Sequence, residues 1–149
     1  MSDNHIRHVA RAVVVDRNQS VLLVRYDHWD SAANSYWVPP GGALEPDENH
    51  RQAASRELTE ETGLSNLAVG PFLWERSFRY QPFGRATHQV EQYFLFKLDL
   101  VAPAVRNNST EQIEEHRWWT LAELRETKDT IFPEGLAFEL EQLFLSLRD

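Results

Sequence analysis

Three glutamates, Glu57, Glu60 and Glu61, are spaced so that a helix would bring their carboxylates together. At about 100° per residue they fall within an arc of roughly 100°. Like charges at these spacings repel one another, and Arg56, four residues before Glu60, offsets only part of that repulsion. A divalent cation neutralises such a cluster better, because Mg²⁺ prefers oxygen ligands and completes its coordination with water and substrate phosphate. The cluster therefore predicts a metal site that meets phosphate; a solvated acidic helix face is the alternative.

A helix that positions these carboxylates has clear ends in the sequence. Asn49 is a good N-cap, and Gln52 at the third helical position completes a variant of the capping box. Gly63 supplies the left-handed residue that ends a helix without a Cβ penalty. Leu58 and Ala54 lie beside the acidic face and can be buried. We therefore expect a helix of about thirteen residues that packs on one side and presents carboxylates on the neighbouring side.

The stretch from Gly42 to Leu64 resembles the Nudix box, whose spacing is G-x5-E-x7-R-E-U-x-E-E-x-G-U with U an aliphatic residue, and matches it at every position. Residues 37–41, WVPPG, resemble the usual approach to that box. The resemblance implies a hydrolase of nucleoside diphosphates linked to another moiety, acting on a pyrophosphate bond with Mg²⁺ or Mn²⁺. It also implies a helix, mixed sheet and helix sandwich.

The resemblance assigns roles to particular residues. Glu57, Glu60 and Glu61 become metal-binding or water-orienting carboxylates, and the backbone carbonyl of Gly41 joins the metal shell. Arg56 holds a glutamate by a salt bridge. Glu48 is a candidate for the outer metal shell. A general base in this family can come from a distant loop. For that base we take Glu114 as the catalytic candidate and leave two alternatives open, Glu111 and Glu115.

Substrate recognition is less clearly marked. Arg25 and Arg79 lie on predicted strands, where a guanidinium can pair with phosphate, and Trp37 can stack on a base. Further candidates of the same two types are Trp29, Tyr36, Arg76, Tyr80 and Arg85. Surface charge is the alternative for the arginines, and a place in the core is the alternative for the aromatic residues.

Composition limits the other possibilities. The chain has 149 residues and a net charge of -8, which argues against a broad nucleic-acid surface, and it has no cysteine for disulfides or thiolate chemistry. No signal peptide and no apolar run long enough to span a membrane are apparent. We expect a cytoplasmic protein that takes a nucleotide-type small molecule and does not bind nucleic acid or membrane; a homodimer stays open.

The remaining sequence predicts an α+β fold in one domain, residues 1–149. Strands are expected at 6–15, 21–25, 37–38, 67–69, 72–80, 90–98 and 116–119, and helices at 121–126 and about 134–147. Residues 27–35 and 99–115 are expected to be loops, and 81–88 to be a hairpin tip.

Two alternatives to a hydrolase follow from the same pattern. A non-hydrolytic nucleotide-binding or sensing Nudix domain usually lacks some box residues, and this chain has them all. Isomerase chemistry on a prenyl diphosphate would need a catalytic cysteine.

Overall fold

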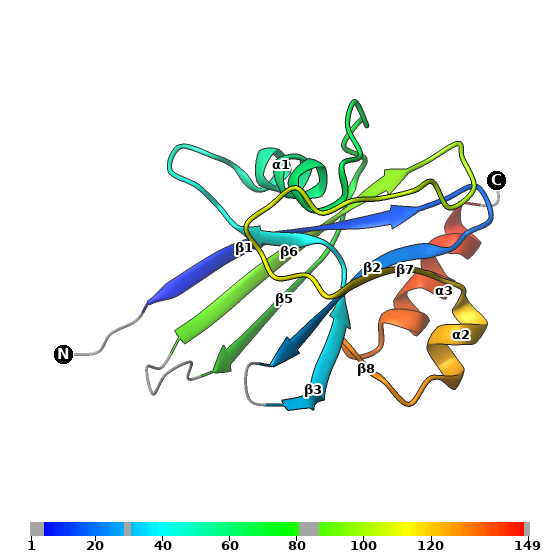
Figure 1. Ribbon diagram of the computed structural model, residues 1–149. Coiled ribbons are helices and arrows are strands. Elements are labelled where there is room, and N and C mark those ends of the chain that lie inside the picture. Colours follow the sequence, from blue (N-terminus) through cyan, green and yellow to red (C-terminus); the bar gives the residue numbers. More distant parts are fainter. Residues whose placement is uncertain (1–4, 29–30, 81–86, 148–149) are drawn as a thin grey trace.

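A computed structural model describes residues 5–28, 31–80 and 87–147. Within these ranges the structure has eight strands and three helices. Figure 1 shows their arrangement. The elements are β1 (Ile6–Val15), β2 (Val21–His28), β3 (Ser31–Val38), β4 (Gly41–Ala43), α1 (His50–Thr62), β5 (Phe72–Tyr80), β6 (Thr87–Lys97), β7 (Glu115–Trp119), α2 (Leu121–Glu126), β8 (Thr130–Ile131) and α3 (Leu136–Ser146).

The strands form one mixed sheet. Its main path runs β5-β6-β1-β2-β3-β8, while β4 pairs with β1 and β7 pairs with β2. β1 and β6 are parallel over ten residue pairs, from Ile6 opposite His88 to Val15 opposite Lys97. The pairs β1 with β4 and β2 with β7 are antiparallel. β1 is therefore the strand on which both the short strand before α1 and the long strand β6 are aligned.

Helices cover both faces of this sheet, and β1 shows why (Figure 1). Successive side chains of a strand point to opposite faces. Ala12 and Val14 belong to the apolar cluster under α1, whereas Val13 and Val15 belong to the cluster under α2 and α3. Both clusters are buried, so β1 is apolar on consecutive positions. The expected helix, mixed sheet and helix sandwich is confirmed.

The first helix has the ends that its sequence predicts. The Asn49 side chain accepts from the backbone N–H of Gln52, and the Gln52 side chain accepts from that of Asn49. Gly63 ends the helix with φ of 76°. Ala54 and Leu58 are buried against the sheet. The helix is therefore fixed in length by its caps and in rotation by its apolar face. The capping box of Thr120 and Glu123 on α2 is confirmed too.

The prediction of a loop over residues 27–35 is wrong. Residues of this segment continue β2 and form β3, with Tyr26 opposite Tyr36 and their rings 5.8 Å apart. The polar residues of 31–35 carry no alternating pattern, so only the backbone pairing with β2 reveals the strand. Residues 29–30 lie outside the described structure.

Other differences are smaller. Residues 67–69 are not a strand, although Leu67 and Val69 pack against the cluster under α1. The short strands β4 and β8 were not predicted, because two or three residues carry no period. The long loop is confirmed and covers residues 98–114. Most of the expected hairpin tip, residues 81–86, lies outside the described structure. Among the described helices, none has the length and apolar character needed to cross a bilayer.

Candidate active site

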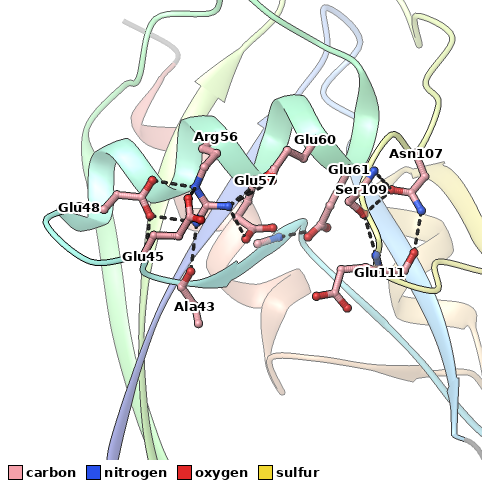
Figure 2. A network of polar contacts seen from close by, with 11 residues as sticks. Ala43, Glu45, Glu48, Arg56, Glu57, Glu60, Glu61, Asn107, Ser109 and Glu111 are labelled. Carbon is pink, nitrogen blue, oxygen red and sulfur yellow. Dashed lines mark hydrogen bonds and ion pairs between the residues drawn. The ribbon is translucent and has the colours of Figure 1, made fainter.

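Arg56 lies at the centre of the polar face of α1 (Figure 2). Its guanidinium donates twice to Glu48, over 2.7 and 2.9 Å, and also donates to Glu57 and Glu60 over 3.0 Å each. A further N–H reaches the carbonyl oxygen of Ala43 on β4 at 3.1 Å. The hydrogen bond from Arg56 is the main cause that lowers the pKa of Glu48. Arg56 thus fixes several carboxylates and ties the helix to β4.

Glu61 is placed differently from the other glutamates of the helix. It is fully buried, one carboxylate oxygen accepts from the backbone N–H of Gly41 at 3.3 Å, and the other finds no partner in the described part of the chain. Burial raises the pKa of Glu61 well above its usual range, and the neighbouring Glu57 raises it further. A buried carboxylate that lacks a partner is costly, so this position needs a proton or a cation.

The glycines before α1 allow β4 to approach both its neighbours. A Cβ on Gly41 would lie 2.3 Å from the carbonyl oxygen of Ala10, and a Cβ on Gly42 would lie 2.6 Å from a carboxylate oxygen of Glu57. Glu57 therefore lies directly over Gly42, and Glu61 reaches Gly41. Two of the three glutamates predicted to bind metal thus converge on the start of β4.

This donor set fits a hard divalent cation. All its donors are oxygens, and one oxygen of Glu61 is buried and unpartnered. Across the described ranges, no three His, Asp or Glu side chains gather closely enough to hold an ion by themselves. Arg56 pairs with Glu57 and Glu60, so these two carboxylates already have a cationic partner. Mg²⁺ commonly binds only one or two protein carboxylates and completes its shell with water and phosphate.

The loop of residues 98–114 is fastened to the C-terminal end of α1. Asn108 N–H donates to the carbonyl of Glu60 at 2.7 Å, and Arg106 N–H donates to that of Thr62 at 2.9 Å. His116 Nε2 lies 2.7 Å from the carbonyl oxygen of Glu61. These contacts satisfy carbonyls that a helix end leaves without partners. The contacts of Asn108 and Arg106 also fix the loop beside the glutamate cluster.

The structure separates the three acids that were candidates for a distant base. Asn107 donates from its side chain to the Glu111 carbonyl at 2.8 Å, and Glu111 N–H donates to Ser109 Oγ at 3.1 Å, so a compact turn holds Glu111 (Figure 2). Figure 2 shows Glu111 on the same side of α1 as Glu61.

A second observation is that Glu61 and Glu111 both act on the same neighbouring group, the Tyr26 hydroxyl. After burial, which is the largest cause, the charges of Glu61 and Glu111 both raise the pKa of the Tyr26 hydroxyl. The other two candidates are tied to β2 instead. Glu114 N–H donates to the carbonyl of Arg25, and Glu115 pairs with the Arg25 guanidinium at 3.4 Å. All three acids are exposed, so exposure does not distinguish them. The turn at Asn107 and its position beside Glu61 therefore favour Glu111 over Glu114, the candidate taken from the sequence.

A cavity of about 580 Å³ opens on the face of the sheet opposite α1. Its lining residues come from β1, β3, β5, β6 and the segment before α3: Arg7, Arg11, Tyr36, Val38, Arg76, Phe78, Gln89, Glu91, Phe132 and Glu134. Gly41 connects the cavity with the glutamates. A Cβ on Gly41 would lie 2.8 Å from Cγ of Arg11, which lines the cavity, and the Gly41 N–H donates to the carboxylate of Glu61.

The three residues predicted to contact substrate, Arg25, Trp37 and Arg79, do not line the cavity. Trp37 is only 3% exposed and packs on Trp119 with ring centroids 5.1 Å apart, so its ring is covered and does not stack on a base. Arg25 pairs with Asp27 and Glu115. Arg79 is exposed on β5 opposite His88 and does not line the cavity. The expectation for Trp37 is corrected because tryptophan has the largest apolar surface to bury.

Sequence reasoning missed most of the cavity. Gln89 lies just before the predicted strand 90–98 and Glu91 lies within it, and their spacing of two, which puts both on one face of a strand, was a usable signal. Arg7 and Arg11 lie four apart on β1 and share its cavity face. Phe132 and Glu134 carried no signal, since the segment before α3 reaches the cavity only through the fold.

A family model described as NUDIX domain matches residues 6–138. The chain is similar to the m7GpppN-mRNA hydrolase NUDT17 of Bos taurus, 42% identical over 62 residues, which are 42% of this chain and 20% of that protein. It is similar to the 8-oxo-dGTP diphosphatase of Proteus vulgaris, 36% identical over 43% of this chain and 56% of that protein. It is also similar to the CTP pyrophosphohydrolase of Escherichia coli K12, 35% identical over 52% of this chain and 54% of that protein.

The matches to these curated relatives thus span between a fifth and just over half of their lengths. Solved structures cover the chain more fully. A MutT protein from Methanosarcina mazei Go1 has a TM-score of 0.70 at 18% identity, with 100% of both chains covered. An Ap4A hydrolase of C. elegans has a TM-score of 0.67 at 21% identity, covering 94% of this chain and 98% of that one. At these identities the likeness shows the fold.

Proposed function

The chain belongs to the NUDIX domain family, and on that premise we propose that it is a metal-dependent hydrolase that cleaves a pyrophosphate bond in a nucleoside diphosphate linked to another moiety. The observation that carries the proposal is the buried Glu61, whose carboxylate has an oxygen without a partner beside Glu57. A protein that only displayed an acidic surface would leave these groups in water.

Glu57, Glu60 and Glu61 are the residues that would hold Mg²⁺ or Mn²⁺, with the Gly41 carbonyl as a further oxygen ligand. When bound, such an ion lowers the pKa of water and stabilises charge on phosphate oxygens. Arg56 keeps Glu57 and Glu60 in position through its hydrogen bonds and does not need to touch substrate.

Glu111 would accept the proton of the attacking water. It is held by the turn at Asn107 and Ser109, and the loop that carries it is fastened to the carbonyls at the end of α1. A base must lie within hydrogen-bond reach of the proton that it removes, and such contacts commonly tighten only when substrate binds. Glu114 stays the alternative.

The non-phosphate part of the substrate would occupy the cavity. Gly41 lies between the cavity and the carboxylates, so a nucleotide can place its phosphates at α1 and its base over Arg11. The names of the relatives include an mRNA cap, 8-oxo-dGTP and CTP as substrates. We infer a small nucleotide as the partner, because a chain of net charge -8 is poorly suited to bind long nucleic acids. We also propose a cytoplasmic location.

The test is a hydrolysis screen with Mg²⁺, with Mn²⁺ and with EDTA. It compares four substrate classes, nucleoside triphosphates including oxidised ones, ADP-ribose, dinucleoside polyphosphates and nucleotide sugars, with product analysis to locate the broken bond. We expect metal-dependent cleavage of at least one class. Tight binding of nucleotides with no product in any class would instead support the non-hydrolytic sensing domain.

A further inference from the structure

The cavity has aromatic walls from opposite ends of the sheet. Phe78 lies on β5 and Phe132 follows β8, and these are the two end strands of the main path. Their side chains remain 38% and 41% exposed. Tyr36 packs edge-on against Phe132 with centroids 5.6 Å apart. Large exposed aromatic faces on opposite walls of one cavity suit a flat ring, which would remove apolar surface from water on both sides.

The floor of the cavity is a chain of hydrogen bonds with a fixed direction. Arg7 donates to the Gln89 side-chain oxygen at 2.7 Å, and the Gln89 amide nitrogen donates to Glu91 at 2.8 Å. Glu91 also accepts from Arg11 at 2.9 Å and from Tyr93 at 2.6 Å. Gln89 and Glu91 are 5% and 4% exposed. Glu91 is therefore occupied, whereas Arg7 keeps N–H donors that can face a ligand, as do the other lining arginines, Arg11 and Arg76.

The segment before α3 supplies a hydrogen-bond acceptor to the cavity. Glu134 lines the cavity two residues after Phe132, is exposed, and makes no ion pair in the described part of the chain. Its carboxylate only accepts hydrogen bonds at neutral pH. A ring in this cavity therefore meets donors from Arg7 and an acceptor from Glu134.

We propose that the cavity selects a 2-amino-6-oxopurine, the guanine type of base. Guanine has acceptors at O6 and N7, which an arginine recognises, and donors at N1 and N2, which a carboxylate recognises. Adenine has an amino group in place of O6 and no N1 hydrogen, so it would turn a donor toward Arg7 and offer no N1–H to Glu134. This inference depends on the proposed function only for the position of the phosphates, which would lie past Gly41 at the glutamates of α1.

The charge around the cavity agrees with an anionic nucleotide. Arg7, Arg11 and Arg76 line it against Glu91 and Glu134, which leaves it positive in a chain whose net charge is -8. Bound phosphates would therefore be drawn toward the side of the molecule that also carries the base site.

The first experiment measures binding of nucleosides without phosphate or metal. Guanosine, inosine and adenosine are titrated by calorimetry into the full chain in EDTA. We expect guanosine to bind at least about tenfold more tightly than adenosine, because a site built for hydrogen bonds penalises groups that leave it unpaired. Inosine, which keeps O6 and N1–H but lacks the 2-amino group, should bind between the two. Equal affinities, or no binding of any nucleoside up to about 1 mM, would overturn the proposal.

Two variants assign the contacts. Glu134→Ala should weaken guanosine about tenfold, inosine less, and adenosine hardly at all; Arg7→Met should weaken guanosine and inosine alike and spare adenosine. Glu139→Ala and Arg17→Met are matched controls, because both side chains are exposed and away from the cavity. Equal losses for all three nucleosides would contradict a specific contact and overturn the assignment.

The two proposals can fail separately. Metal-dependent cleavage at the same rate for every base would contradict the guanine proposal and support the hydrolase proposal. Selective binding of guanosine without cleavage of any substrate would contradict the hydrolase proposal and support the guanine proposal. Melting temperatures of each variant in EDTA identify any that fail to fold, and Glu134→Gln then replaces Glu134→Ala because it keeps the side-chain volume while halving the acceptor capacity.

Discussion

The backbone N–H of Gly41 donates to the carboxylate of Glu61 at 3.3 Å, and this bond joins the short strand β4 to the last turn of α1. Gly41 also pairs with Arg11 of β1. The metal-site candidate, the cavity floor and the central strand therefore meet at one residue. This contact explains why α1, the helix of the Nudix box, has a fixed position relative to β4.

Glu61→Gln is expected to lower turnover by at least about 100-fold, because an amide oxygen binds a cation more weakly and cannot take a negative charge. The fold should be at least as stable without metal, since burying an amide costs less than burying a carboxylate. Turnover and urea unfolding in EDTA are the measurements, and Glu126→Gln on the surface of α2 is the control. Near-normal turnover of Glu61→Gln would remove Glu61 from the site.

Arg56→Met should destabilise the protein by about 2 kcal/mol in EDTA, because it removes charge-assisted hydrogen bonds and leaves Glu48, Glu57 and Glu60 to repel one another. Added Mg²⁺ should recover part of that loss. Chemical unfolding with and without the ion tests this. Arg125→Met, which breaks an exposed pair with Glu141, should cost no more than about 0.5 kcal/mol.

The two glycines before α1 should respond differently to alanine. Gly41→Ala places a methyl group 2.3 Å from the Ala10 carbonyl, which belongs to the backbone, so the fold itself should be destabilised. Gly42→Ala meets the flexible end of Glu57 at 2.6 Å, which can move. We expect Gly42→Ala to melt close to the parent protein and to lose turnover. Equal melting temperatures for both variants would contradict the packing described here.

Stabilisation by Mg²⁺ should increase with pH. Burial raises the pKa of Glu61 in the folded protein above its value in the unfolded chain. Without metal the folded protein therefore holds one more proton than the unfolded chain between these two pKa values. The contribution of this proton to folding stability is lost as the pH rises toward the raised pKa. The ion competes with this proton and binds better when it has left. The difference in melting temperature between Mg²⁺ and EDTA should therefore grow from about pH 6 to about pH 9, and Glu61→Gln should flatten the trend.

Glu111→Gln is expected to lower kcat by about 100-fold with little change in KM, whereas Glu114→Gln and Glu115→Gln should have small effects. The reason is that the turn at Asn107 holds Glu111 on the Glu61 side, while the other two acids are tied to β2. Steady-state kinetics of the three variants separates them. A large loss for Glu114→Gln alone would restore the choice made from the sequence.

The sequence by itself determined the box helix. Its caps at Asn49 and Gly63, its apolar face at Leu58 and its row of glutamates are local, because capping and helical period depend on residues only a few positions apart. The layers of the fold also followed from the period of strands and helices and from the resemblance that the box carries.

Only the tertiary structure decided the rest. The burial of Glu61, the choice of Glu111 over Glu114 and the cavity between Phe78 and Phe132 all depend on segments that are distant in the chain. Residues 31–35 form a strand only because β2 offers its backbone groups, and Trp37 is covered because Trp119 packs on it. Such contacts have no period in the sequence, since the energy that fixes them comes from pairing and burial between elements.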